Sequence, residues 1–249
     1  GRCANVLTSL EFERLLHRPR GPLPRRIAFI QCVGSRDERL GCPTCSASCC
    51  MITAKQVRLL KQAAPEAEVT VYSMDVRAAG KGYERYVEQA AALPGVTYRW
   101  GRPAAVHQVG TPIAAGATTA PLPPSARASP RLAPGASLRV LAPGGEDEYD
   151  LVVLAVGLGP AEGVRELVAC AGVALDEDGF ILPGGEGPGS TTRPGVYAAG
   201  YALAPADVPE VVTQAAAAAA LAAEALGGRG SASHGLARAE ESKGAAAAP

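Results

Sequence analysis

Hydrophobic residues in the first half of the chain fall into two kinds of pattern. Short continuous runs rich in Val, Ile and aromatic residues predict buried strands, and apolar positions at helical spacing predict helices. In chain order, the patterns predict a strand and a helix within 4–16, strands at 27–32, 69–73 and 96–100, and helices over 46–63 and 82–92. This alternation is typical of an α/β fold with a parallel sheet and crossover helices, the nucleotide-binding type.

The second half is patterned less regularly. Residues 111–134 are mostly Ala, Pro, Ser and Thr without periodicity, so we expect a disordered insertion there rather than an element. The remaining patterns predict strands at 138–141 and 151–156, a small hairpin over 173–182 that turns at Glu177 to Gly179, a strand at 195–199 and an Ala-rich helix around 211–226. The tail after Leu226 is expected to be disordered.

Composition excludes some partners. Lys plus Arg (24) equals Asp plus Glu (24) and aromatic residues make up 4%, so neither a basic field nor a base-stacking surface for nucleic acid is expected. The Ala-rich run is shorter than the ~20 apolar residues of a membrane span, so none is predicted. The chain begins with Gly1 and shows no secretory signal, which predicts a fragment of a cytoplasmic protein.

Cysteines are concentrated in one segment. Five of the seven lie between Cys32 and Cys50, which indicates metal or redox chemistry rather than a disulfide framework. Cys32 ends a predicted strand, at the place where a nucleotide-binding fold normally has a Gly-rich turn for pyrophosphate. Cys45, Cys49 and Cys50 fall at the start of a predicted helix, where unpaired amides and the positive dipole end favour an anionic, thiolate-bound cluster. Four thiolates are the usual ligands of a [4Fe–4S] cluster.

Other interpretations of these cysteines stay open. Cys42 and Cys45 have the C-x₂-C spacing of a structural zinc site, although no second such pair exists and adjacent Cys49 and Cys50 suit tetrahedral zinc poorly. The same CPTC sequence could be a thioredoxin-like dithiol. The remaining cysteines, Cys3 and Cys170, are interpreted as buried and inert. A non-catalytic interaction module, with a structural metal and no flavin, is the alternative function.

The chain resembles the A subunit of heterodisulfide reductase, a flavin-containing iron–sulfur protein. The stretches that carry the resemblance include NVLTSLEFERLL, IAFIQCVGSRDE, VTVYSMDVRAAGKGYERY, DLVVLAVGL, LDEDGFIL and PGVYAAGYALAPADVPEVVTQAAAAAA, and they follow the expected order over most of 4–226. The resemblance implies a thioredoxin-reductase-like flavoprotein whose NAD-like domain carries the cluster. Cys32, Cys45, Cys49 and Cys50 reproduce the ligand intervals of the family, and Cys42 falls outside them.

The resemblance also implies FAD. Its implied contacts are Gly157 at a strand end, Gly200 and Tyr201 at the pyrophosphate and ribityl chain, and backbone amides of Val208, Pro209 and Val211 near the flavin ring. Lys55 would lie near the flavin N5, with Glu11 as its acidic partner; Glu13 is nearly as eligible, and a capping role for Glu11 is the alternative. The G-x-G-x-x-G turn that grips the ADP half is absent and is expected upstream of this chain.

The resemblance further implies a division into domains. Residues 1–22 would be a segment of the FAD domain, 23–157 the NAD-like domain with an insertion at 111–137, 158–226 the C-terminal part of the FAD domain, and 227–249 a disordered tail. The implied function is an oxidoreductase subunit that moves electrons between FAD and [4Fe–4S] clusters. Its partners would be the other subunits of such a complex and electron donor or acceptor proteins.

Overall fold

A computed structural model describes the chain in two compact units, Gly1–Leu158 and Gly159–Pro249. The described residues are 3, 5–19, 21–110, 132–185 and 187–244, with side chains described as far as Gly227. Most of the expected insertion therefore lies outside the described residues.

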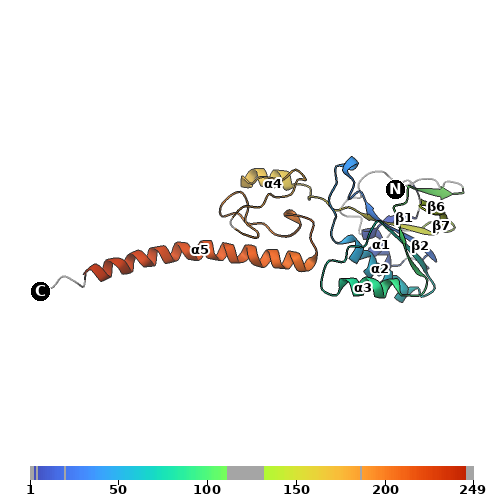
Figure 1. The fold of residues 1–249 in the computed structure, drawn as a ribbon, viewed down its shortest axis with the longest axis horizontal. Coiled ribbons are helices and arrows are strands. Elements are labelled where there is room, and N and C mark those ends of the chain that lie inside the picture. The colour runs from blue at the N-terminus through green and yellow to red at the C-terminus, as the bar shows by residue number, and fades with distance from the viewer. Residues whose placement is uncertain (1–2, 4, 20, 111–131, 186, 245–249) are drawn as a thin grey trace. The chain divides into compact units, whose positions relative to one another are not determined.

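The first unit is built on a parallel sheet of five strands in the order β1-β8-β2-β3-β4 (Figure 1). Its strands are β1 (Val6–Thr8), β2 (Arg26–Val33), β3 (Glu68–Ser73), β4 (Val96–Trp100) and β8 (Leu151–Val156). The helices that follow the first three strands are α1 (Ser9–His17), α2 (Cys49–Ala63) and α3 (Tyr83–Ala91). The α/β class with crossover helices is thus confirmed.

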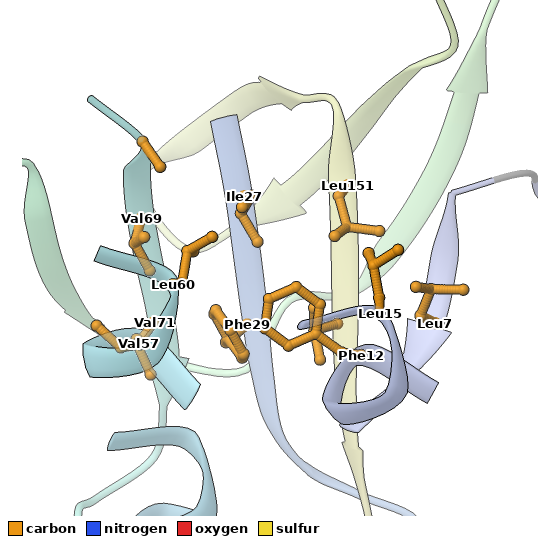
Figure 2. Packing of buried hydrophobic residues seen from close by; sticks show 12 residues of the cluster. Leu7, Phe12, Leu15, Ile27, Phe29, Val57, Leu60, Val69, Val71 and Leu151 are labelled. Carbon is orange, nitrogen blue, oxygen red and sulfur yellow. The ribbon is translucent and has the colours of Figure 1, made fainter. Parts of the chain in front are cut away.

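Helices α1 and α2 cover one face of this sheet. Phe12 and Leu15 of α1 and Leu60 of α2 pack against Ile27 and Phe29 of β2 (Figure 2), and all five are nearly inaccessible to solvent. The rings of Phe12 and Phe29 meet edge to face with centroids 5.3 Å apart. A strand buried on both faces needs a continuous apolar run, which is what β2 provides.

A second, antiparallel sheet packs on the opposite face. It consists of β5 (Ala105–Val109), β6 (Ser137–Ala142) and β7 (Gly145–Tyr149), in that order. Leu138 and Val140 of β6 are fully buried and join Ala28 and Val152 of the parallel sheet in one cluster. The sequence predicted β6 but not β5 or β7, because β7 is polar and its register depends on β6 rather than on an apolar pattern.

The expected boundary between residues 22 and 23 has no counterpart in the structure. Strand β1 pairs with β8, and α1 packs in the same core as β2, so the first segment belongs to the sheet that holds the rest of the unit. Pairing between strands so distant in sequence is decided by tertiary packing. The other expected boundary, between 157 and 158, lies one residue from the division between the units.

The second unit contains two helices and little regular strand. Its elements are α4 (Val164–Ala171), the 3₁₀ turn η2 (Gly200–Ala202) and α5 (Val208–Gly244), joined by segments with isolated bridges. One bridge, between Leu175 and Ile181, lies at the predicted hairpin, and the N–H of Gly179 bonds to the carbonyl of Asp176 in its turn.

Two predictions for this unit differ from the structure. The predicted strand at 195–199 is reduced to a single bridge at Tyr197, because Gly195 has φ +81° and the N–H of Val196 turns back to the carbonyl of Arg193. Helix α5 continues to Gly244 instead of ending near Leu226. No proline interrupts the chain between Pro209 and Pro249, and Ala, Leu, Glu and Arg, which favour helix, are frequent there.

Among the described residues, no helix combines the length and apolar character needed to cross a membrane.

Candidate metal centre

Cys32 is presented by an irregularity at the carboxyl end of β2. In the ladder with β8, Ile30 pairs with Leu154 and Val33 pairs with Val156. Between these two pairs β2 advances by three residues and β8 by two, so β2 has a bulge there. Cys32 has φ +57°, a left-handed conformation that non-glycine residues rarely adopt. Such strain costs about 1–3 kcal/mol and gathers at functional sites, where a bulge redirects a side chain.

The four predicted ligands come together. One pocket has Cys32 from β2, Cys45 from the following loop, and Cys49 and Cys50 from the first turn of α2 among its lining residues. The others that line it are Ser35, Arg36, Ser46, Ala47, Asp75 and Arg77. The structure thus assembles residues from separate segments at the carboxyl edge of the parallel sheet, where such folds usually bind their ligands.

The start of α2 suits an anion. Ser48, the residue before the helix, makes no capping hydrogen bond with its side chain, and this 15-residue helix has no acidic residue in its first turn. The orphan amides and the positive end of the helix dipole therefore act beside Cys49 and Cys50. Two further amides donate to the sulfurs: the N–H of Ala47 to Cys45 Sγ (3.4 Å) and the N–H of Arg77 to Cys50 Sγ (3.5 Å).

A charged rim accompanies the cysteines. Arg36 Nη1 lies 4.0 Å from Cys32 Sγ and also pairs with Asp75, whose other oxygen is 3.5 Å from Arg77 Nε. The hydrogen bond from Arg36 lowers the pKa of Asp75, so this carboxyl is ionised and fixes both arginines. Two guanidinium groups against one carboxylate leave the rim positive, which complements thiolate ligands.

The thiols themselves are partly buried. Burial raises the pKa of Cys49 and Cys50, and the charges of the neighbouring cysteines add to the increase. A hydrogen bond with Ser46 opposes this for Cys49, and the N–H of Arg77 opposes it for Cys50. The raised pKa keeps both thiols protonated, and the binding of a metal would release their protons.

Among the described residues, no three His, Cys, Asp or Glu side chains stand close enough together to hold a single metal ion. The four cysteines line one pocket as free thiols.

The other cysteines lie elsewhere. Cys42 is exposed and is held in a tight turn by two backbone hydrogen bonds with Asp37, outside the lining of the pocket. Cys3 is half-buried against the core between the two sheets. Cys170 is exposed on α4, so its interpretation as a buried residue is wrong. Val168 is the buried residue of the short helix α4, and Cys170 lies on another face of this helix.

Lys55 pairs with Glu13 rather than Glu11. Lys55 Nζ lies 2.8 Å from Glu13 Oε1, and Gln56 donates to the other oxygen of the same carboxylate at 2.9 Å. Glu11 instead closes the capping box of α1, because its Oε2 accepts from the N–H (2.7 Å) and the hydroxyl (2.9 Å) of Thr8. Glu11 thus has a structural role at the start of α1, and the acidic partner of Lys55 is Glu13.

Gly157 has a structural explanation of its own. It follows β8, its N–H bonds to the carbonyl of Val33 (2.7 Å), and a Cβ atom there would lie 2.7 Å from the carbonyl oxygen of Gly34. Only glycine allows this close approach of the backbone. The residue therefore holds the turn that follows Cys32 against the end of β8.

The other implied flavin residues gather at the start of α5. Gly200 (φ +70°) donates its N–H to the side chain of Gln214, and a Cβ there would lie 3.1 Å from Val211. The ring of Tyr201 contacts that of Phe180, with centroids 6.3 Å apart.

The expected amide donors at this helix start are largely lacking. Proline has no N–H, so Pro209 cannot donate. The N–H of Val211 bonds to the carbonyl of Asp207, and the carboxylate of Asp207 caps the N–H of Glu210. The prediction of a row of flavin-facing amides over 208–211 is therefore not supported by the backbone. Asp207, which the sequence analysis missed, could have been found as an Asp three residues before Glu210 at a helix start.

No protein-family model matches the chain, whereas several curated proteins are similar to it in sequence. The A subunit of the H₂:CoB–CoM heterodisulfide,ferredoxin reductase from Methanothermobacter marburgensis is 39% identical over 236 residues, which cover 90% of this chain and 33% of that protein. The iron–sulfur A subunit of the CoB–CoM heterodisulfide reductase from Methanocaldococcus jannaschii is 36% identical over 225 residues, 85% of this chain and 32% of that protein.

Over most of its length, the chain is similar to part of the A subunits of heterodisulfide reductases. It spans about a third of the length of the curated relatives that it matches. Among solved structures, an engineered water-forming NADPH oxidase covers 77% of this chain at 15% identity with a TM-score of 0.44, over 35% of its own length. The flavoprotein disulfide reductase RclA of Escherichia coli covers 72% of this chain at 13% identity with a TM-score of 0.37, over 31% of its own length. Scores this low carry no information about the site.

Proposed function

We propose that Cys32, Cys45, Cys49 and Cys50 hold one [4Fe–4S] cluster, and that the chain is part of an iron–sulfur flavoprotein subunit of a heterodisulfide-reductase-like oxidoreductase. The observation that supports the proposal most is the convergence of these cysteines on one positively rimmed pocket. Bound there, the cluster would supply one-electron transfer. Relatives that are named as iron–sulfur subunits support the same assignment.

The chain's own residues would hold the cluster and compensate its charge. The strained backbone at Cys32 aims one thiolate into the pocket, and the first turn of α2 supplies two more. The amides of Ala47 and Arg77, together with the guanidinium of Arg36, would donate to the ligand sulfurs. Hydrogen bonds and positive charge around thiolates stabilise the more negative, reduced state of such a centre.

FAD is the second cofactor of the proposal, and the support for it comes from the family. Gly157 and Gly200 have packing reasons of their own, and the start of α5 offers fewer amide donors than expected. We therefore assign no role in flavin binding to Gly157 and Gly200. Two other residues are retained as candidates for contact with the flavin. These are the exposed Val208 at the start of α5 and Lys55, which Glu13 orients.

The domain roles and partners are proposals of the same kind. The first unit would be the NAD-like domain and the second the C-terminal part of a FAD domain. Other subunits of a reductase complex and electron donor or acceptor proteins would be the partners. The alternative, a metal-stabilised interaction module without flavin, lacks a specific observation in its favour, since Cys42 lies outside the pocket that contains Cys45.

Anaerobic reconstitution with iron and sulfide tests the cluster. We expect about four iron and four sulfide per chain, with broad visible absorption that bleaches on reduction. Stoichiometric zinc without iron under strict anaerobiosis would contradict the cluster and favour the interaction module.

A titration with FAD tests the flavin part separately. Without a G-x-G-x-x-G turn, the chain is expected to bind FAD weakly, because each charge-assisted contact contributes about 1.5–3 kcal/mol and every ~1.4 kcal/mol changes affinity tenfold. In a longer relative-like protein that contains this segment and binds FAD, Lys55→Ala should retain the flavin but change its reduction potential, because a nearby cation favours the anionic reduced flavin. Tight, stoichiometric binding to the chain alone would show that the determinants are misplaced.

A further inference from the structure

A small void lies beside Cys50, next to the pocket that the four cysteines line. It is lined by Gln31, Cys50, Val71, Ser73, Val76 and Tyr98. Gln31 directly precedes Cys32 on β2, and Tyr98 comes from β4. The void therefore borders the cysteine site through the side chain of one ligand and the neighbour of another.

Two of the residues that line this void each have a buried polar atom with no hydrogen-bond partner: Gln31 Oε1 and Tyr98 Oη. The amide nitrogen of Gln31 is satisfied, because it donates to Thr53 Oγ1 at 2.6 Å, and both of these residues are almost fully buried. Buried polar groups in folded proteins nearly always find a partner, so an orphan donor and an orphan acceptor beside a cysteine site require an explanation.

Water does not provide it. The void is too small to hold a water molecule. A buried water needs about 10–15 Å³ of free volume and two or more polar partners. The partner of the tyrosine hydroxyl must therefore be an atom of the protein or of what the protein binds.

We propose that Tyr98 is a positioning residue that donates a hydrogen bond from its hydroxyl to the sulfur of Cys50 when that sulfur is a cluster ligand. The inference rests on the proposed [4Fe–4S] site and extends it. A ligand thiolate is a better acceptor than a neutral thiol, so the bond would strengthen on cluster binding. Tyr98 of β4 lines the same void as Cys50, and its buried hydroxyl has no other hydrogen-bond partner.

The chemistry of the tyrosine agrees with a donor role. Burial, together with the nearby charge of Cys50, raises the pKa of Tyr98 to about 12. The hydroxyl therefore keeps its proton at neutral pH. A donor to a ligand sulfur stabilises the reduced cluster more than the oxidised one, because reduction adds negative charge, and so it raises the reduction potential.

The test compares two tyrosine-to-phenylalanine variants of the reconstituted chain. Tyr98→Phe removes the proposed donor, and Tyr86→Phe is the matched control, since both rings pack against the same small cluster of Ala54, Val87 and Ala90. We expect wild-type iron content in both variants. In Tyr98→Phe the equilibrium constant for reduction should fall about tenfold, which is about 59 mV more negative for one electron, and Tyr86→Phe should be unchanged.

The outcomes separate the two proposals. Full iron content with an unchanged potential in Tyr98→Phe would overturn the role of Tyr98 and leave the cluster assignment standing. Absence of iron from the wild-type chain would overturn the cluster assignment, and the inference with it. A lower reduction potential in both variants would show a general packing effect and would also overturn the inference.

Stability provides a second measurement. If the hydroxyl bonds to Cys50 in the loaded state alone, Tyr98→Phe should leave the stability of the cluster-free chain unchanged and should speed the loss of iron to a chelator several-fold. If the hydroxyl instead turns to Gln31 Oε1, the phenylalanine variant would unfold more readily without the cluster and lose iron at the wild-type rate. That result would overturn the inference.

Discussion

The two units differ in how firmly they hold their candidate sites. In the first, the cysteines sit at the ends of elements whose other ends are anchored in a core of fully buried side chains such as Phe29 and Leu60. In the second, the candidate flavin residues stand at the start of a helix whose apolar side chains are largely exposed: 76% for Val208, 62% for Val212 and 72% for Leu226. A rigid scaffold can force a strained residue such as Cys32 into place, whereas a helix with few buried neighbours cannot.

The largest expected effect is the loss of the cluster from the first unit. Cys32→Ala, Cys45→Ala, Cys49→Ala and Cys50→Ala should each abolish or degrade the iron signal, because each removes one of four ligands. Cys42→Ala, in the same unit, and Cys170→Ala, in the second, should retain full iron. Iron and sulfide analysis after anaerobic reconstitution measures the effect. Loss of iron in Cys42→Ala would contradict the ligand assignment.

The contrast in burial predicts a contrast in stability. Phe29→Ala should lower the free energy of unfolding by about 3–5 kcal/mol, because the side chain is fully buried and leaves a cavity. Val212→Ala should change it by less than about 0.5 kcal/mol, since that side chain is exposed on α5. Urea denaturation followed by circular dichroism measures both. Equal losses would mean that α5 is covered by contacts that the structure of the unit does not show.

Two glycines on either side of the division between the units sharpen the comparison. Gly157→Ala would place a Cβ 2.7 Å from the carbonyl oxygen of Gly34, so we expect a loss of about 1–3 kcal/mol and weaker iron binding. A Cβ at Gly159 would meet nothing within 4 Å, so Gly159→Ala should be neutral or slightly stabilising. Thermal unfolding with and without iron checks both. A neutral Gly157→Ala would show that the turn after Cys32 adjusts freely.

The smallest expected effect concerns the ion pair on the helices of the first unit. Burial opposes ionisation of Glu13, but the hydrogen bonds from Lys55 and Gln56 outweigh it, so the pKa of Glu13 is lowered. The pair therefore stabilises the fold above the ordinary pKa of a glutamate, and this contribution disappears as pH falls through the lowered value. Because the Lys55 side chain is 47% exposed, we expect the pair to contribute under about 1 kcal/mol to the free energy of unfolding.

The measurement is the free energy of unfolding of Glu13→Gln against wild type. The difference should be present at pH 7 and should disappear as the pH falls through the lowered pKa of Glu13. Glu66→Gln, whose residue lies in the loop before β3, is a control that should show no such difference. A difference that persists in acid would assign the effect to packing rather than to charge.

Much of the first unit could be predicted from the sequence. Apolar runs marked β2 and β8, because strands covered on both faces must be apolar almost throughout. The β-branched and aromatic residues of β3 and β4 marked those two strands. The cysteine intervals indicated the four residues that the structure brings to one pocket. The rim of Arg36, Asp75 and Arg77 escaped prediction because these residues matter through proximity across the sheet edge. A usable signal was present, since Asp75 and Arg77 follow the carboxyl end of a strand next to β2.

The errors have a common physical cause. Glu11 and Glu13 are two positions apart in one helix, and only the packing of α1 beside α2 shows that Glu13 faces Lys55 while Glu11 caps its own helix. The exposed position of Cys170 and the missing strand at 195–199 likewise depend on which face is covered and which backbone turns. Local sequence contains neither kind of information.

The sequence by itself determined the α/β class and the positions of the parallel strands, since these follow from apolar periodicity, and it indicated the four cysteines that are proposed as ligands. Only the tertiary structure decided that β1 joins β8, that a bulge turns Cys32 toward the start of α2, and that Tyr98 shares a void with Cys50. These are contacts between residues far apart in the chain. Their free energies depend on packing and on desolvation, which exist only once the sheet has formed.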